Sequence, residues 1–345
     1  MKRLLLPACT IALFGFFNLF GIKSGLHIYH FVFFLLGLVA YFVVRSIGWQ
    51  FFRLNARFFY WFFVGLLIIT FIIGVNSRGS TRWIDFYFLR FQASEFMKSI
   101  FAVFMAAYLS EHVHDIDSPR VFIKGLIYFL IPTFLIFKQP DLANSLVYVC
   151  IYLSILFFSK VPKRFILITL IVGALLLPFS WLLLKEYQKA RVTSFFNPHI
   201  DTQGTAYNMT QAVITVGSGR FMGRGLGLGT QSRLYFLPEN STDFAYSSLV
   251  EQFGFVGGLV VVFMYFMIIM ALVRKLLGYS TQKDSDTTYM YLYTVGLTSY
   301  LGFQIFVNVG MNLGILPVAG VALPFISYGG SAIMSTLIGL ALVPS

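Results

Sequence analysis

The sequence predicts an all-α protein that crosses a membrane many times. Hydrophobic residues make up 58% of the 345 positions, charged residues only 11%, and the mean hydropathy is +0.80. A soluble domain carries roughly 25% charged residues, so a water-soluble fold is excluded. The apolar residues form continuous runs of about 20 residues rather than alternating patterns, which indicates spanning helices and not a β-barrel.

The apolar runs predict ten spanning helices and one large polar loop. The loop covers residues 185–245 and separates the seventh span from the eighth. No soluble domain or internal repeat interrupts the chain, so we expect a single integral-membrane domain over residues 1–345. The predicted spans are 4–21, 27–44, 58–76, 95–110, 121–137, 142–159, 163–184, 245–273, 288–309 and 319–342.

The basic residues of the short loops predict the orientation of these spans. With a cytoplasmic N-terminus, thirteen Lys and Arg residues face the cytoplasm and five face outward, so we expect both termini in the cytoplasm. The 185–245 loop then lies outside. Because ATP and nucleotide sugars are cytosolic, a catalyst there needs a substrate with its own leaving group, such as a lipid-linked sugar pyrophosphate. The dispersed basic residues are typical of topology signals, and we expect no nucleic-acid partner. The five outward residues are Lys23, Arg78, Arg82, Arg90 and Lys138.

One carboxylate stands where the long loop meets the eighth span. Asp243 is expected at the top of this helix, partly out of water, with Tyr235, Phe236 and Phe244 as apolar surroundings. Such a position suits a general base. It also suits a helix cap, and both roles stay open. Glu251, two turns further along, is a secondary carboxylate.

Four further ionisable residues lie at the outer ends of earlier spans. Glu95 and Lys98 are spaced i, i+3 on one face of the fourth span, and Ser94 is placed to cap that helix. A buried pair of this kind is costly, so it marks either a functional site or a structural ion pair. Arg82 can reach a phosphate. Asp141 follows a proline and suits either a helix cap or a substrate contact.

The large loop holds candidate ligands for an anion. Arg191 ends an expected amphipathic segment, and Gln211 lies in an expected short helix at the membrane surface. The glycine-rich run 217–231 contains Arg220 and Arg224, and its backbone N–H groups could converge on a phosphate. A loop that needs only tight turns would have the same composition. The run matches neither the Walker nor the dinucleotide pattern.

The late segment 308–331 is rich in glycine and proline. Small residues permit close helix packing, and Pro317 and Pro324 with polar neighbours also suit a broken helix around a site. Asp-x-Asp patterns at 115–117 and 284–286 are typical of metal-dependent glycosyltransferases. Both face the cytoplasm in this topology, so we interpret them as solvated loop residues.

Several motifs together resemble the SEDS proteins (shape, elongation, division and sporulation), which are ten-span bacterial peptidoglycan polymerases. The likeness runs from about residue 74 to the C-terminus in family order, and GTQSRLYFLPE looks more like the RodA branch than the FtsW branch. The motifs are GSTRWI, FQASEFMK, QPDL, GRGLGLGTQ, LPENSTDF and NVGMNLGILPVAGVALPFISYGGS.

This resemblance implies a glycosyltransferase that polymerises lipid II on the outer face of the bacterial cytoplasmic membrane, for cell elongation and shape. The family's essential acidic residue falls on Asp243, its SEF-K pair on Glu95 and Lys98, and its RW and QPD motifs on Arg82 and Asp141. In the implied mechanism, Asp243 deprotonates the 4-hydroxyl of the acceptor N-acetylglucosamine. That oxygen attacks the anomeric carbon of the donor, and undecaprenyl pyrophosphate leaves.

The same resemblance implies partners. These are a class B penicillin-binding protein, which is a transpeptidase, and other membrane proteins of the elongation complex. A divalent cation, Mg²⁺ or Mn²⁺, beside the basic residues would offset the charge of the leaving group. Ala93 and Asn240 depart from the usual proline and histidine of the family, but neither change touches Asp243. The alternative functions are a flippase or transporter of lipid-linked precursors and a structural scaffold.

Overall fold

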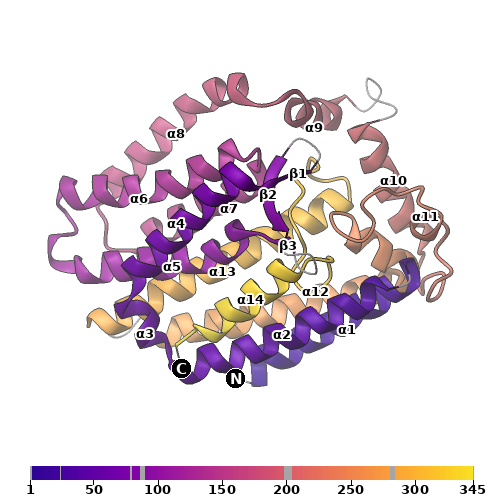
Figure 1. Cartoon of the computed structure of the whole chain (residues 1–345), viewed down its shortest axis with the longest axis horizontal. Helices are drawn as coiled ribbons and strands as arrows, with labels where there is room; N and C mark the ends of the chain where they lie inside the picture. Colours follow the sequence, from indigo (N-terminus) through magenta and orange to yellow (C-terminus); the bar gives the residue numbers. More distant parts are fainter. Residues whose placement is uncertain are drawn as a thin grey trace. The chain divides into compact units, whose positions relative to one another are not determined.

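Helices dominate the computed structural model, and this confirms the predicted all-α class (Figure 1). The structure describes residues 2–23, 25–77, 80–85, 90–197, 204–279 and 284–344, so Arg78 and Gly79 of the predicted motifs lie outside the described residues. The principal helices are α1 (Lys2–Ile22), α2 (Leu26–Ile47), α3 (Trp49–Leu54), α4 (Ala56–Ile73), α5 (Ala93–Glu111), α6 (Pro119–Lys138), α7 (Leu142–Phe158), α8 (Lys163–Leu183), α9 (Glu186–Phe196), α10 (Thr205–Ser218), α11 (Thr230–Arg233), α12 (Ala245–Tyr279), α13 (Ser285–Asn312) and α14 (Gly330–Ala341).

Three short strands stand between α4 and α5, where the sequence predicted only a loop. They are β1 (Val75–Ser77), β2 (Ser80–Asp85) and β3 (Arg90–Phe91), and each pairs antiparallel with the next. Strand β2 carries Arg82 of the predicted site.

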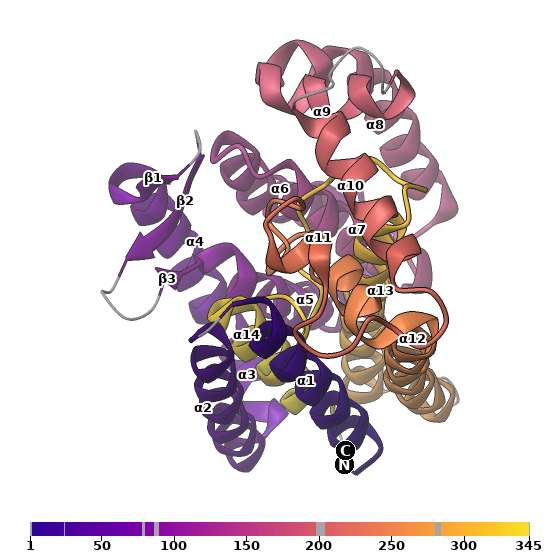
Figure 2. The same ribbon diagram turned by 90° about the vertical axis from the view of Figure 1, so that its right-hand side faces the viewer.

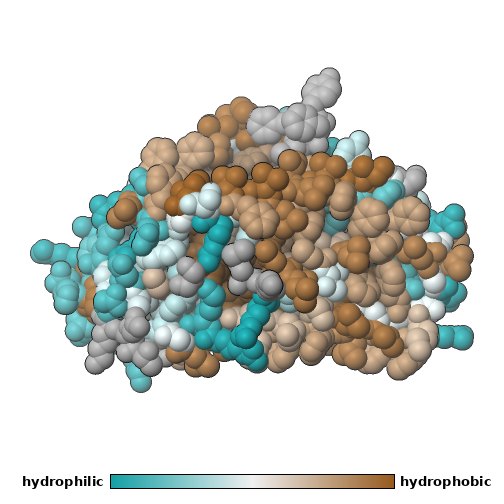
Figure 3. Space-filling view, turned by 90° about the horizontal axis from the view of Figure 1, so that it is seen from below, coloured by the Kyte–Doolittle hydropathy of each residue, from teal (hydrophilic) through white to brown (hydrophobic). Residues whose placement is uncertain are grey.

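The chain is a multi-pass membrane protein. In the described part of the chain, six helices are long and apolar enough to cross a bilayer, and α7 and α14 are shorter apolar helices. Helix α8 has large exposed side chains such as Leu175, Phe179 and Leu182, which suit contact with lipid rather than water. The space-filling view shows such apolar surface across much of the visible face (Figure 3). The six helices cover Arg3–Ile22, Leu26–Ile47, Ala56–Ile73, Pro119–Lys138, Lys163–Leu183 and Ala245–Tyr279.

The chain folds into two compact units, and each unit is assembled from three stretches of sequence. Unit 1 comprises Met1–Val39, Glu186–Ala271 and Leu301–Met334. Unit 2 comprises Ala40–Lys185, Leu272–Tyr300 and Ser335–Ser345. A single domain over the whole chain remains a prediction.

Helix α5 lies at the centre of unit 2, beside α4 and α7 (Figure 2). Every residue from Met97 to Ser110 is buried, as expected for a helix that is apolar on all sides. Its side chains pack closely against neighbouring helices; for example, Tyr60 of α4 stacks on Phe104 with ring centroids 4.2 Å apart. This burial places Glu95 and Lys98, at the start of α5, inside the protein.

In unit 1, the glycine-rich run is built into a break in α12. The helix is interrupted at Gly254, whose φ of 72° lies in the left-handed region that glycine tolerates. Beyond the break, the N–H groups of Phe255 and Val256 donate to the carbonyl oxygens of Arg220 and Phe221, at 2.9 and 3.2 Å. The run therefore supplies the hydrogen-bond partners that the interrupted helix lacks.

The tenth predicted span is wrong over its first half. Residues 313–329 are not helical, and α14 begins only at Gly330. Two prolines, Pro317 and Pro324, cannot donate the N–H that a helix needs, and Gly320 adopts a φ of +74°. Side chains of neighbouring helices satisfy the exposed carbonyls instead; Asn308 Nδ2, for example, donates to the Val321 oxygen at 2.7 Å. Such irregular backbone is tolerated at membrane depth where protein covers it.

Candidate functional site

Asp243 lies in the turn immediately before α12, and it is half-buried. Two asparagines of α13 hold its backbone: Asn308 Nδ2 and Asn312 Nδ2 each donate to the Asp243 carbonyl oxygen at 3.1 Å. The side chain oxygen of Asn312 also accepts from the Ser247 N–H at 2.9 Å and from the Ser247 hydroxyl at 2.7 Å. An acceptor from another helix therefore caps an N–H of the first turn of α12. Side chains of α13 thus hold the backbone of Asp243 in place.

Arg191 of α9 approaches the same place. Its Nη1 donates to the Ala319 carbonyl oxygen at 3.2 Å, and its guanidinium lies over the Tyr187 ring, 5.8 Å from the centroid. Gly320 lies close to both the arginine and the aspartate. A Cβ added at Gly320 would lie 3.1 Å from Arg191 Nη1 and 3.4 Å from Asp243 Oδ2. A cation and a carboxylate thus face one glycine, with room between them only because that residue has no side chain.

We expect Gly320→Ala to lower the activity of this site by roughly 10- to 100-fold, because displacement by about 1 Å is enough for such a loss. The methyl group would push against Arg191, and alanine at a left-handed φ costs about 1–2 kcal/mol. The measurement is turnover per folded protein. Gly302→Ala is the control, since an added Cβ there meets no atom within 4 Å. Equal turnover in both variants would contradict the assignment of Arg191 and Asp243 to one site.

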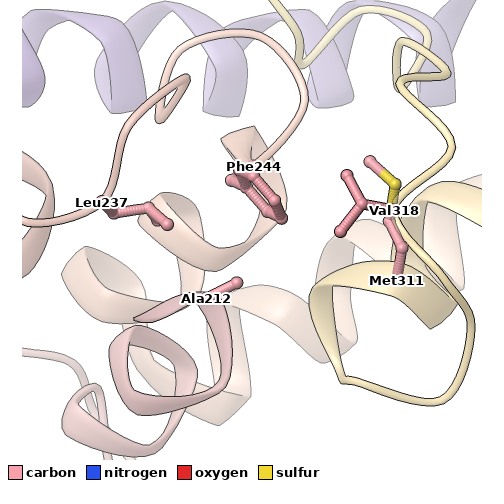
Figure 4. Packing of buried hydrophobic residues seen from close by; sticks show 5 residues of the cluster. All are labelled: Ala212, Leu237, Phe244, Met311 and Val318. Atoms are coloured by element: carbon pink, nitrogen blue, oxygen red, sulfur yellow. The ribbon is translucent and has the colours of Figure 1, made fainter. Parts of the chain in front are cut away.

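A small apolar cluster holds the surroundings of Asp243 together (Figure 4). Phe244 packs with side chains from α10, from the end of α13 and from the non-helical segment that follows it; the cluster comprises Ala212, Leu237, Phe244, Met311 and Val318. Helix α10 extends the helix predicted around Tyr207–Ala212. Gln211 precedes the cluster residue Ala212, and its buried Oε1 has no hydrogen-bond partner among the described residues.

The end of the glycine-rich run and the residue that follows it donate to an anion, which is the protein's own Glu251. The Gln231 N–H donates to Glu251 Oε1 at 2.8 Å. The Ser232 N–H and hydroxyl donate to Oε2 at 2.9 and 2.6 Å, and the Ser218 hydroxyl donates to Oε1 at 3.3 Å. Glu251 is fully buried, so these bonds replace its hydration. It therefore fastens the run to α12.

Arg220 and Arg224 extend from this run and are exposed. The Nε of Arg224 donates to the Ser218 carbonyl oxygen at 3.1 Å, which leaves further guanidinium donors for another ligand. The Arg224 side chain thus contacts the run itself, and the role of both arginines in substrate binding remains a prediction.

Unit 2 contains the other predicted residues in one buried polar chain. Lys98 Nζ donates to Glu95 Oε2 at 2.7 Å, and the side chains are only 1% and 7% exposed. Lys98 also donates to Asn144 Oδ1 at 3.3 Å, and Asn144 Nδ2 donates in turn to Asp141 Oδ2 at 2.8 Å. Charge-assisted hydrogen bonds of this kind satisfy groups that burial would otherwise penalise.

Asp141 takes the capping role that its sequence allowed, and a substrate contact of its side chain remains a prediction. It caps α7 by accepting from the Asn144 N–H at 3.2 Å, and its Oδ1 lies 3.4 Å from Arg82 Nη1. Arg82 is 25% exposed and is the member of this chain that reaches the surface. Ser94, by contrast, does not cap α5. The helix begins one residue earlier, at Ala93, so Ser94 already lies inside the first turn.

No metal-ligand set is found in the described ranges, where no three His, Cys, Asp or Glu side chains lie together. A cation held chiefly by substrate phosphates stays a prediction.

Comparison with known proteins identifies the family to which this chain belongs. The family model for FtsW, RodA and SpoVE, described as "Cell cycle protein", matches residues 9–345. The chain belongs to the FtsW/RodA/SpoVE family. MrdB of Escherichia coli K12, named a peptidoglycan glycosyltransferase, is 35% identical over 313 residues, which cover 90% of this chain and 82% of MrdB.

Two solved structures are also similar in fold to this FtsW/RodA/SpoVE family member. One chain comes from a study described as "Structural coordination of polymerization and crosslinking by a peptidoglycan synthase complex". It has a TM-score of 0.81 and 28% identity, and the match covers 99% of this chain and 96% of that one. RodA of Thermus thermophilus has a TM-score of 0.72 and 25% identity, with 99% and 95% covered.

Sequence reasoning missed four residues that shape these sites. Asn308 and Asn312 were interpreted as part of a packing segment, although their i, i+4 spacing places both amides on one face of a spanning helix. Asn144 was given no role, and Gly320 was only one of many glycines in the late segment. For Asn144 and Gly320 no local signal was available, because their roles arise from residues far away in the sequence.

Proposed function

We propose that the protein is a peptidoglycan glycosyltransferase that polymerises lipid II into glycan strands, for cell elongation and shape. The observation that carries the proposal is the half-buried Asp243, with its backbone held by Asn308 and Asn312 and with Arg191 beside the same glycine. Family membership and the name of MrdB support the reaction class. A carboxylate on a backbone that is held in place suits a general base, whose position must be set before its proton transfer.

In the proposed reaction, Asp243 removes the proton from the 4-hydroxyl of the acceptor N-acetylglucosamine. The oxygen forms a bond to the anomeric carbon of the donor sugar. The bond from that carbon to the pyrophosphate breaks, and its electron pair leaves with undecaprenyl pyrophosphate. Arg191 and Asp243 both lie against Gly320, so Arg191 is the proposed partner for the negative charge that develops on the leaving group.

Further substrate contacts are proposed for Gln211 and Arg82. The buried amide oxygen of Gln211 can accept a hydrogen bond from a sugar hydroxyl. Arg82 is oriented by Asp141 and partly exposed, so it can meet a phosphate. Glu95 and Lys98 are proposed to support Arg82 in this role, through the hydrogen bonds that link Lys98 to Asn144 and Asn144 to Asp141. Arg220 and Arg224 are proposed to meet the lipid-linked diphosphate.

The proposed location is the bacterial cytoplasmic membrane, with both termini in the cytoplasm. The excess of basic residues in loops assigned to the cytoplasmic side supports this orientation. The proposed partner is a class B penicillin-binding protein, with other membrane proteins of the elongation complex. A neighbour from a peptidoglycan synthase complex that couples polymerization and crosslinking supports a transpeptidase in that role.

Polymerisation of labelled lipid II by the purified protein, alone and with its transpeptidase, tests the proposal. We expect glycan chains long enough to form a ladder on a gel. Movement of lipid II across vesicle membranes without any polymer would favour a flippase instead. No polymer and no movement from folded protein with its partner would favour a scaffold.

A further inference from the structure

The large outer loop exposes a group of apolar side chains, which is unfavourable in water. Four large apolar side chains of the glycine-rich run are between 41% and 74% exposed: Phe221, Met222, Leu226 and Leu228. Arginines 220, 224 and 233 are interleaved with them and exposed, and residues 220–236 contain no Asp or Glu. An exposed apolar patch rimmed by one sign of charge indicates a binding surface.

The run is rigidly placed rather than free to turn its apolar side chains inward. The N–H groups of Arg224 and Gly225 donate to the carbonyl oxygens of Glu251 and Gln252, at 2.9 and 3.1 Å. An added Cβ at Gly223 would lie 2.2 Å from the Gln252 oxygen, so the two backbones are in direct contact. The exposed side chains are therefore held outward by the fold.

The length of α12 places this surface at a membrane boundary. Beyond the break at Gly254, the helix from Phe255 to Tyr279 is about 37 Å long at 1.5 Å per residue. That length is enough to cross a hydrocarbon core of about 30 Å. Phe255 then lies near the outer boundary, and the ring of Phe221 stacks against it with centroids 6.1 Å apart.

Helix α1 independently indicates the same depth of the glycine-rich run in the membrane. Its 21 residues reach about 31 Å and end at Ile22, after the basic N-terminal pair expected in the cytoplasm. Near this outer end, the Gly227 N–H donates to Gln252 Oε1 at 3.0 Å, and Gln252 Nε2 donates to Asn18 Oδ1 at 2.8 Å. The outer end of α1 and the break in α12 therefore both contact the glycine-rich run, and they lie at the same depth in the membrane.

We propose that residues 220–228 form an interfacial anchor that dips into the outer leaflet of the bilayer and binds phospholipid. Phe221, Met222, Leu226 and Leu228 would enter the boundary of the acyl chains, continuous with the exposed Phe255. Arg220 and Arg224 would lie at the level of the lipid phosphates, as basic residues do in interfacial segments, and from that level they can also meet the diphosphate of a lipid-linked substrate. The proposal concerns bulk phospholipid and does not depend on the proposed enzymatic reaction. It makes this part of the large loop a membrane contact.

Depth measurements by spin-label EPR test the anchor. Nitroxide labels would be attached to Met222→Cys or Leu228→Cys in a chain carrying Cys9→Ala and Cys150→Ala, reconstituted in vesicles of phosphatidylethanolamine and phosphatidylglycerol without any lipid-linked sugar. The reference positions are His114→Cys in a polar loop and Phe263→Cys in the middle of α12. Relative accessibility to oxygen and to a water-soluble nickel complex gives the depth of each label.

We expect both loop labels to show at least threefold less access to the nickel complex than the label at position 114, and more than the label at position 263. Nickel access equal to that at position 114 would overturn the proposal. Shielding that appears only after addition of an undecaprenyl-pyrophosphate-linked sugar would also overturn it, in favour of substrate contact. Shielding that appears only with the transpeptidase would overturn it in favour of a protein interface.

Discussion

Asp243→Asn is expected to lower lipid II polymerisation by about 10²- to 10⁴-fold, the usual contribution of a positioned acid or base. The substitution is nearly isosteric, and Asn308 and Asn312 bind the backbone carbonyl of residue 243 rather than its side chain. The two hydrogen bonds therefore survive, and the variant is expected to fold normally. Glycan chain synthesis from labelled lipid II is the measurement.

Binding of lipid II separates the catalytic role of Asp243 from a structural one. A variant that lacks only the base should bind lipid II with an affinity within a few-fold of the parent protein. The matched control is Asp115→Asn, which removes one exposed carboxylate from a loop on the predicted cytoplasmic side. Wild-type chains from Asp243→Asn would rule out this aspartate as the base.

Lys98→Met is expected to destabilise the protein by about 3–5 kcal/mol, because it leaves the buried Glu95 carboxylate without its cation. Lys98 is 1% exposed, and its ammonium is shared between Glu95 and Asn144. Thermal unfolding of the purified protein in detergent measures the change. Lys189→Met is the matched control, since Lys189 pairs with Glu186 at the same i, i+3 spacing and a similar distance, 2.9 Å, but the Glu186 side chain is 90% exposed. An exposed pair contributes at most about 1 kcal/mol.

Exchanging the buried pair separates its structural role from its functional one. The double variant Glu95→Lys, Lys98→Glu keeps both charges but reverses the donor that meets Asn144 and, through it, Asp141 and Arg82. We expect it to accumulate in the membrane while polymerisation falls at least tenfold. Polymerisation close to that of the parent protein would assign the pair to helix packing alone.

The sequence by itself determined the fold class, most helix positions and the family. These follow from local properties: a run of about 20 apolar residues cannot satisfy its backbone in lipid except as a helix, and the motifs around Glu95, Asp141 and Asp243 are short and contiguous. The capping role of Asp141 was also predictable, because a cap involves residues only three positions apart.

Only the tertiary structure decided how these residues are used. Arg191 and Asp243 face one glycine because chain segments far apart in sequence meet there, and no local pattern encodes that contact. The same holds for Glu251, whose carboxylate accepts from the Gln231 N–H at the end of the glycine-rich run. The prediction of the tenth span was wrong for a related reason. Its apolar composition predicts a helix, but side chains such as Asn308 stabilise an irregular backbone there. Apolar periodicity reports which residues avoid water, and it cannot report which distant group satisfies each polar atom.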